Sequence, residues 1–349
     1  MIMALWIPWY NALLMLRPAF SYKATFLWFM VCIAGLSVRD DNLGVTSIVR
    51  ALSLDESRYY NLLRCCHSAA IKLPILSQVW VKSVLALFGE HIERVNGRII
   101  LLADGKKHAK AGKKMPGVKY LHQHSESNTK PNYVMAHSAQ CVSVLARAAN
   151  TLFSVPLDMK IHEGLVFSNR DTRTLLDKLL IMIDGLALTE SFYLVADAYY
   201  GSGELIKSLL RQDNHLITRA KNSFVAYHPA PKHRGKTRRG RPSFYGKKML
   251  LVNLFRSALA VTTIDSPVYG EKGVKLRIRT CDLLWKPAGQ LVRFVLVDHP
   301  TRGRMILMCS DLTLEPSQII RLYGLRFKIE LGFKQAAHVI GAYDYHFWM

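Results

Sequence analysis

The sequence predicts an α/β fold that follows a helical region and contains a β-rich insertion. Short apolar, β-branched runs alternate with helical spacing in residues 96–220, which is typical of strands and helices in α/β layers. Residues 1–95 show helical spacing throughout. Residues 221–310 contain a basic loop and several short β-rich runs, and residues 311–349 return to helical spacing, completing the core.

The chain is strongly basic. Its 349 residues include 47 Lys and Arg against 25 Asp and Glu, a formal net charge of +22. Half of the residues are hydrophobic, which excludes a disordered chain. This charge excess predicts a polyanionic partner, with nucleic acid first and an anionic membrane surface second.

The apolar N-terminus raises the question of a membrane segment. Residues 1–16 are uncharged, but Pro8 interrupts them and Arg17 ends them. Residues 24–38 form a second apolar run of only 15 residues, whereas a spanning helix needs about 20. The start also lacks the basic residues of a signal peptide. We therefore expect buried helices and no membrane, with a membrane-associated basic protein as the alternative.

The cysteines favour a reducing compartment. The six residues form no CxxC pair, and the adjacent Cys65, Cys66 and His67 would point about 100° apart on a helix, which is poor geometry for one shared ion. We expect reduced structural thiols in a cytoplasmic protein.

Two short helical patterns in the N-terminal region are compatible with a helix-turn-helix. They cover residues 44–52 and 56–67, with turn and N-cap chemistry at 53–55. A DNA-binding unit of this kind within 44–67 would carry Arg58, Tyr59, Tyr60 and Arg64 on its second helix. The alternative is an ordinary helical hairpin.

The α/β region contains six expected elements. In chain order they are a strand at 98–103 that stops at Asp104, a strand at 133–145, a helix at 172–184, a strand at 191–196 that stops at Asp197, a helix at 201–211 and a strand at 215–219.

The insertion begins with a flexible basic loop over residues 221–250, which includes Arg238, Arg239 and Arg241. The β-rich runs that follow predict antiparallel strands at 250–255, 258–263, 275–279 and 291–297. After Asp311, residues 315–337 are expected to form one helix.

Asp104 and Asp197 follow buried strands in the same way, each after an apolar run that ends in Ala. A carboxylate there is costly unless its charge is compensated, and a divalent metal is a common compensator. Ligands also bind at that end of open α/β sheets. The alternative is that each Asp caps the turn after its strand.

A third carboxylate lies on the C-terminal helix. Tyr323, Arg326, Glu330 and Lys334 are spaced three, four and four positions apart, so on one helix they form a single polar stripe. An intrahelical pair of Glu330 and Lys334 would explain only those two residues.

The motif Tyr-x-x-Arg-x-x-x-Glu-x-x-x-Lys, preceded by two strand-end Asp residues, resembles the DDE transposases of bacterial insertion sequences. The resemblance covers about residues 98–340 and implies a ribonuclease-H-like catalytic core with a β-rich insertion between the second Asp and the Glu. The sequence departs from the group at Ala337, where a second Lys is common, and it stops at Met349, where relatives usually continue. These departures predict a truncated copy.

The resemblance also implies chemistry and partners. Asp104, Asp197 and Glu330 would bind two Mg²⁺ ions, with Mn²⁺ as a substitute, and a water activated there would cut transposon ends before the freed 3′-hydroxyl attacks target DNA. Double-stranded DNA is the expected partner, bound by a homodimer in the bacterial cytoplasm at the nucleoid. The expected DNA contacts are Tyr323, Arg326, Lys334, Lys106, Lys107, Arg238, Arg239 and Arg241.

Two alternative hypotheses about function stay open. One is an inactive, truncated remnant that binds DNA without catalysis. The other is a different nuclease with a ribonuclease-H-like core, such as a resolvase.

Overall fold

The computed structural model describes residues 2–41, 44–110, 112, 115–122, 132–162, 171–231 and 242–341. Arg238, Arg239 and Arg241 of the predicted basic loop lie outside these residues. The chain forms two compact units, which are described separately. Unit 1 comprises Met1–Glu93, Gly105–Leu188 and Ile329–Met349, and unit 2 comprises Arg94–Asp104 and Thr189–Lys328.

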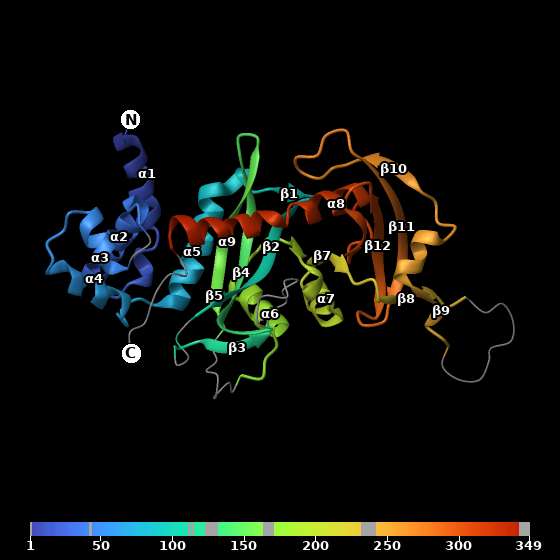
Figure 1. The fold of residues 1–349 in the computed structure, drawn as a ribbon, viewed down its shortest axis with the longest axis horizontal. Helices are drawn as coiled ribbons and strands as arrows, with labels where there is room; N and C mark the ends of the chain where they lie inside the picture. Colours follow the sequence, from blue (N-terminus) through green and yellow to red (C-terminus); the bar gives the residue numbers. More distant parts are fainter. Residues whose placement is uncertain are drawn as a thin grey trace. The chain divides into compact units, whose positions relative to one another are not determined.

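The first part of unit 1 is helical, as predicted (Figure 1). Its helices are α1 (Ile2–Leu14), α2 (Lys23–Val38), α3 (Val45–Ala51), α4 (Arg58–Cys66) and α5 (Leu73–Phe88). They enclose two apolar clusters, one around Phe20 and Phe26 and one around Ile48 and Leu62. No helix in the described residues has the length and apolarity needed to cross a membrane.

Helices α3 and α4 confirm that two short helices lie within residues 44–67. Leu62 of α4 is fully buried, and Tyr59 packs against the same apolar cluster. Arg58, Tyr60 and Arg64 are exposed. Three of the four side chains expected on a DNA-facing surface are therefore accessible, while Tyr59 belongs to the core of the pair. DNA binding by this pair stays a prediction.

The strands of unit 1 form an antiparallel meander of β3 (Val118–His122), β4 (Tyr133–Ala148) and β5 (Thr151–Ile161). Helix α6 (Leu175–Gly185) packs against β4. Sequence patterns did not predict β5, because Pro156 interrupts it and a proline usually argues against a strand. The structure accommodates Pro156 at a β-bulge, where the register with β4 shifts.

Unit 2 is built on three neighbouring parallel strands. β6 (Phe192–Ala196) lies between β2 (Arg98–Ala109) and β7 (His215–Ala220). All five residues of β6 are buried, as expected for a parallel strand covered on both faces. Helix α7 (Gly203–Leu210) packs against β7.

The insertion extends the same sheet. Its strands are β8 (Val225–Pro229), β9 (Tyr245–Leu250), β10 (Thr262–Asp265), β11 (Lys275–Trp285), β12 (Gln290–His299) and β13 (Gly303–Cys309). β11, β12 and β13 pair antiparallel in succession, and β13 pairs antiparallel with β7. The strands expected at 275–279 and 291–297 are therefore present as β11 and β12, and the insertion continues the sheet from β7 outward.

Two of the predicted insertion strands are wrong. Residues expected as a strand at 250–255 form mainly the 3-10 helix Leu251–Arg256, because Leu251, Leu254 and Phe255 are buried at helical spacing. The strand expected at 258–263 is β10, which begins only at Thr262.

The C-terminal segment also differs from the prediction of one continuous helix. It forms α8 (Pro316–Gly324) and α9 (Phe327–Val339), with Leu325 and Arg326 in a turn between them. The amide of Leu325 donates to the carbonyls of Arg321 and Leu322, and that of Arg326 to Tyr323. Helix α8 packs over β6, β7, β12 and β13 (Figure 1).

Candidate active site

Asp104 and Asp197 lie at the same level of two neighbouring parallel strands. Strands β2 and β6 are in register from Ile99 and Phe192 to Ala103 and Ala196. Each aspartate is the next residue after the last of these pairs. Because paired strands lie about 4.8 Å apart, the fold brings these two carboxylates to one edge of the buried part of the sheet.

The predicted end of the first strand needs correction. β2 does not stop at Asp104 but continues to Ala109. Its residues are buried up to Ala103, and from Asp104 on they alternate between half-buried and exposed. The apolar run therefore ends where the sequence predicts, but it marks the end of burial on both faces rather than the end of the strand.

Asp197 begins a short 3-10 helix, Ala198–Tyr200. Its Oδ1 accepts a hydrogen bond of 2.9 Å from the amide of Tyr199, and its backbone carbonyl accepts one of 2.6 Å from the hydroxyl of Thr218 on β7. Asp197 thus caps the next turn, as the alternative interpretation required. A carboxylate has about four acceptor positions, so the cap leaves capacity for another ligand.

Asp104 is compensated by a cation from a distant part of the sequence. Arg326 Nη1 lies 3.2 Å from Asp104 Oδ2, and both side chains are mostly buried, with exposed fractions of 21% and 15%. Arg326 occupies the turn between α8 and α9. The break in the predicted single helix therefore lies at the residue that reaches the carboxylate pair.

Tyr323 lies near the second aspartate. Burial raises the pKa of the Tyr323 hydroxyl and the charge of Asp197 adds to this, whereas Arg326 and Arg219 lower it. Arg219, on β7, is a residue that the sequence analysis missed. Its signal was its place near the end of the third parallel strand, beside two strands that carry the aspartates.

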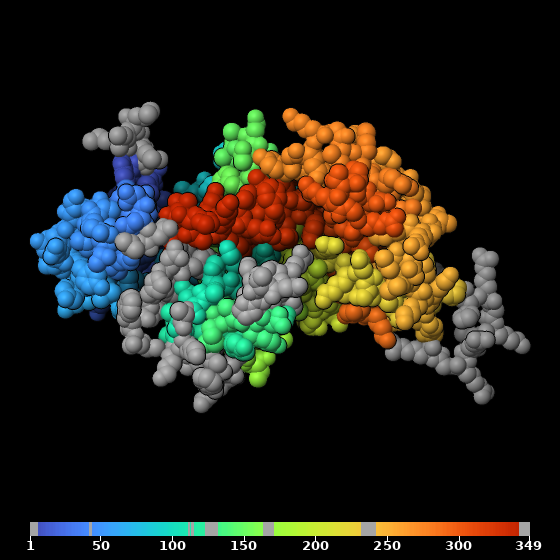
Figure 2. All heavy atoms as spheres, in the orientation of Figure 1, coloured from blue at the N-terminus to red at the C-terminus, as the bar shows by residue number. Residues whose placement is uncertain are grey.

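Tyr323 and Arg326 also line a cavity of about 170 Å³ within unit 2. Its other walls come from α8 and from the insertion, including Val268, His299 and Arg302. In Figure 2 the atoms of the insertion, in orange, lie beside those of α8. The insertion therefore contributes directly to the surroundings of the two residues nearest the aspartates.

Glu330 and Lys334 belong to the part of α9 in unit 1, and both are exposed. Lys106 and Lys107 follow each other on β2, so their side chains point to opposite faces. Lys106 Nζ lies 6.0 Å from the ring centre of Phe333, and Lys107 Nζ donates to the carbonyl of His122 at 2.6 Å. Lys106 therefore points to the same face of β2 as Asp104, whereas Lys107 bonds to β3 through His122.

The structure thus brings together Asp104, Asp197, Arg326 and Tyr323. Across the described residues, no set of three or more His, Cys, Asp or Glu side chains has an arrangement that would hold a metal ion. The two aspartates nevertheless offer hard carboxylate oxygens, the donor type that Mg²⁺ and Mn²⁺ take. The role of Glu330 as a third ligand stays a prediction.

Comparison with known proteins identifies one family. A family model described as a transposase DDE domain matches residues 95–339. No curated protein matches the chain. Among solved structures, the crystal structure of the NurA nuclease from Sulfolobus solfataricus is similar with a TM-score of 0.31 and 8% identity, over 85% of this chain and 100% of that one. At this TM-score the likeness supports no argument.

Proposed function

This chain belongs to the family of transposases with a DDE domain, and from that premise we propose that it cuts DNA at transposon ends and joins the cut strand to target DNA. The observation that carries the proposal is the position of Asp104 and Asp197, level with each other on neighbouring parallel strands. Glu330, on α9, is the proposed third carboxylate.

The proposed core is ribonuclease-H-like. Two features of the sheet support it: the parallel strands β2, β6 and β7, and the antiparallel meander that contains β4 and β5. The strands of the insertion lie between Asp197 and Glu330 in the sequence, where the DDE group has its β-rich segment.

The aspartates fit a site for divalent metal. Asp104 is mostly buried beside the positive charge of Arg326, and its carboxylate oxygens are of the donor type that Mg²⁺ and Mn²⁺ take, which supports the proposal. Mg²⁺ or Mn²⁺ bound by Asp104, Asp197 and Glu330 would activate the attacking oxygen and stabilise charge on the leaving oxygen.

The residues around the pair have separate proposed roles. Arg326 orients Asp104 through their ion pair, and its guanidinium has further donors for a DNA phosphate. The charges of Arg219 and Asp197 both act on the pKa of Tyr323, which indicates that the three side chains are near one another. We therefore assign Tyr323 and Arg219 to contacts with the DNA strand near the cut. Lys106 and Lys334 are the proposed phosphate contacts of unit 1.

The wider DNA interaction rests on charge. We propose that a homodimer binds double-stranded DNA through its basic surface, with helices α3 and α4 adding a second contact through Arg58, Tyr60 and Arg64. The net charge of +22 supports this partner. We place the protein in the bacterial cytoplasm, at the nucleoid.

The test is cleavage of supercoiled plasmid DNA with Mg²⁺ or Mn²⁺, which requires no knowledge of the transposon ends. The wild-type chain should nick the plasmid, and Asp104→Asn, Asp197→Asn and Glu330→Gln should each lower the rate at least 100-fold, as expected for loss of a metal ligand. Asp265→Asn is the matched control, because Asp265 is an exposed residue of β10 paired with Lys275.

Two results would contradict the proposal in different ways. Equal nicking by the wild type and the three variants would show that these carboxylates are not the catalytic site. Tight DNA binding without nicking by the wild type would instead support the inactive remnant.

A further inference from the structure

A second cluster of charged residues lies in unit 1, where β5 ends and α6 begins. A cavity of about 210 Å³ there is lined by Lys160, His162, Asp171, Arg173 and Lys178, together with three apolar side chains. This is room for several water molecules, each of about 30 Å³ in the liquid.

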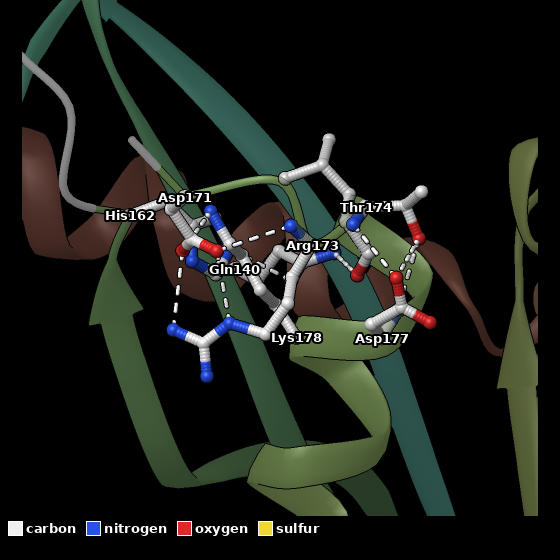
Figure 3. A network of polar contacts seen from close by, with 8 residues as sticks. Gln140, His162, Asp171, Arg173, Thr174, Asp177 and Lys178 are labelled. Atoms are coloured by element: carbon white, nitrogen blue, oxygen red, sulfur yellow. Dashed lines mark hydrogen bonds and ion pairs between the residues drawn. The ribbon is translucent and has the colours of Figure 1, made fainter. Parts of the chain in front are cut away.

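The centre of the cavity is Asp171, which is shared by two cations. Lys178 Nζ lies 2.9 Å from Asp171 Oδ2, and Arg173 Nε lies 2.9 Å from Oδ1 (Figure 3). These contacts, first with Arg173 and then with Lys178, hold the pKa of the Asp171 carboxyl well below its usual value. Lys178 has only 9% of its side chain exposed, so its charge is buried beside that of Arg173.

A third cation, Lys119 on β3, lies near Lys178. Burial, followed by the charge of Lys178, lowers the pKa of Lys119 on β3. Lys160 lies nearby and is paired with Asp158 at 3.2 Å. Among the described residues around the cavity, the four cations Lys119, Lys160, Arg173 and Lys178 lie near the carboxylates of Asp158, Asp171 and Asp177, so cations are in excess there.

His162 is held in the same cavity as a neutral donor. Burial, and then the charges of Lys178 and Lys119, lower the pKa of His162 to about 4. Its Nε2 lies 2.7 Å from Gln140 Oε1, and Gln140 Nε2 donates to the carbonyl of Leu175 at 3.0 Å. Because the amide nitrogen of Gln140 is used as a donor, its oxygen accepts, and His162 Nε2 carries the proton.

The first turn of α6 offsets this excess only in part, because the charge of Asp177 interacts with Arg173. Its N-terminus is closed by a capping box in which Thr174 and Asp177 bond to each other's backbone amides. Figure 3 shows this pair directed away from the contacts of Asp171. The carboxylate of Asp177 therefore bonds mainly within the helix, while Asp171 pairs with Arg173 and Lys178 and Asp158 pairs with Lys160.

We propose that this cavity binds a phosphate group of the DNA backbone. A phosphodiester carries one negative charge and two oxygens that accept hydrogen bonds, and Lys and Arg side chains are its usual partners in proteins. Lys178, Lys119 and Arg173 supply the charge, and the Asp171 carboxylate holds Arg173 and Lys178 in position. The inference rests on the proposed DNA function, but it concerns residues that take no part in the carboxylate site.

The test is the salt dependence of binding to a short fluorescein-labelled DNA duplex, followed by fluorescence anisotropy. Lys119→Gln and Lys178→Gln should each weaken binding roughly tenfold, the equivalent of one charged hydrogen bond. Each should also reduce the slope of log affinity against log salt by about 0.9, the value for one lost phosphate contact. Lys119→Arg should restore both quantities.

The matched control is Lys82→Gln, which removes the same charge from an exposed position on α5. It should leave the affinity within about twofold and the slope unchanged. Equal behaviour of Lys82→Gln, Lys119→Gln and Lys178→Gln would overturn the inference. Thermal unfolding shows whether Lys178→Gln is folded. If that variant is unfolded, the result for Lys119→Gln alone tests the inference.

Inorganic phosphate distinguishes the two sources of the ligand. The NMR signal of His162 should move with duplex DNA in the wild type and remain in place in Lys119→Gln. Movement with inorganic phosphate alone would assign the cavity to a free anion and overturn the DNA assignment. Absence of movement with either ligand would overturn both.

The outcome is also separable from that of the proposed function. A wild-type chain that nicks plasmid DNA while the cavity variants bind like the control contradicts only the cavity. A chain whose His162 signal responds to DNA but that does not nick contradicts only the catalytic proposal.

Discussion

Arg326 illustrates how one residue links two distant parts of the sequence. It lies in the turn between α8 and α9, and its guanidinium is 3.2 Å from the carboxylate of Asp104 on β2. Sequence spacing predicted that Arg326 shares a helical stripe with Glu330, but it gave no indication of a contact with Asp104.

Replacement of Arg326 should impair catalysis more than stability. Arg326→Ala removes the ion pair with Asp104 and the proposed phosphate contact, so we expect plasmid nicking to slow at least tenfold. Arg326→Lys should recover part of the rate, because it keeps the charge but loses the planar fork. The measurement is the initial rate of nicking.

Arg211→Ala is the control for this change, since Arg211 is exposed at the end of α7. A rate in Arg326→Ala equal to that of Arg211→Ala would contradict a role for Arg326 at the site.

His162 predicts a pH dependence of stability. Its pKa is about 4 in the folded chain, compared with about 6.5 when unfolded. As pH falls below 6.5, the unfolded state binds a proton that the folded state does not bind. The free energy of unfolding therefore decreases until about pH 4. At pH 5 the loss is roughly 2 kcal/mol. The measurement is urea unfolding at pH 7.5 and pH 5.

Comparison with His162→Gln isolates this contribution from other titrating groups. Gln cannot be protonated, so the variant should lose less stability than the wild type between the two pH values. Parallel pH profiles for the two proteins would show that His162 titrates normally.

At the scale of elements, helix α6 is the clearest case of local sequence determining structure. Thr174 accepts a hydrogen bond of 3.2 Å from the amide of Asp177, and Asp177 accepts one of 2.7 Å from the amide of Thr174. The apolar spacing in residues 172–184 predicted the helix, and this capping box determines where it begins.

Loss of the cap should therefore destabilise unit 1. We expect Thr174→Ala to lower the free energy of unfolding by about 1 kcal/mol, measured by urea unfolding at neutral pH. Thr174→Ser keeps the hydroxyl and should remain close to the wild type. A neutral effect of Thr174→Ala would mean that α6 is stabilised by packing alone.

Other elements were less predictable because their local patterns conflicted with their environment. Pro156 argued against a strand at the position of β5. The strand forms nevertheless, with the proline next to a bulge in its pairing with β4. Residues 250–255 combine apolar residues with helical burial, and short apolar runs of this kind do not distinguish strand from helix. The turn at Leu325 and Arg326 contains no proline that would have indicated it.

At the scale of the molecule, close packing between distant segments makes some positions intolerant of change. Gly203, at the start of α7, lies against Pro287 in the turn between β11 and β12. A Cβ atom at Gly203 would lie 2.2 Å from the carbonyl carbon of Pro287. Nothing in the neighbourhood of Gly203 in the sequence indicates this contact.

We expect Gly203→Ala to lower the free energy of unfolding by at least about 2 kcal/mol, because a backbone must move to make room. Gly185→Ala is the control. No atom lies within 4 Å of its added Cβ, and alanine is the better helix former. Thermal unfolding of both variants checks the prediction, and similar melting temperatures would contradict it.

The sequence by itself determined the α/β class, the helical start of the chain, the two buried apolar runs that end at Asp104 and Asp197, and the basic character that points to DNA. These properties depend on composition and on the spacing of neighbouring residues, which local physics makes readable. The tertiary structure decided that β2 and β6 are neighbours in register, that Arg326 reaches Asp104, and that the charge of Lys178 acts on Lys119. These interactions join residues far apart in the chain, and sequence spacing cannot specify which distant strands pair or which charges meet when they do.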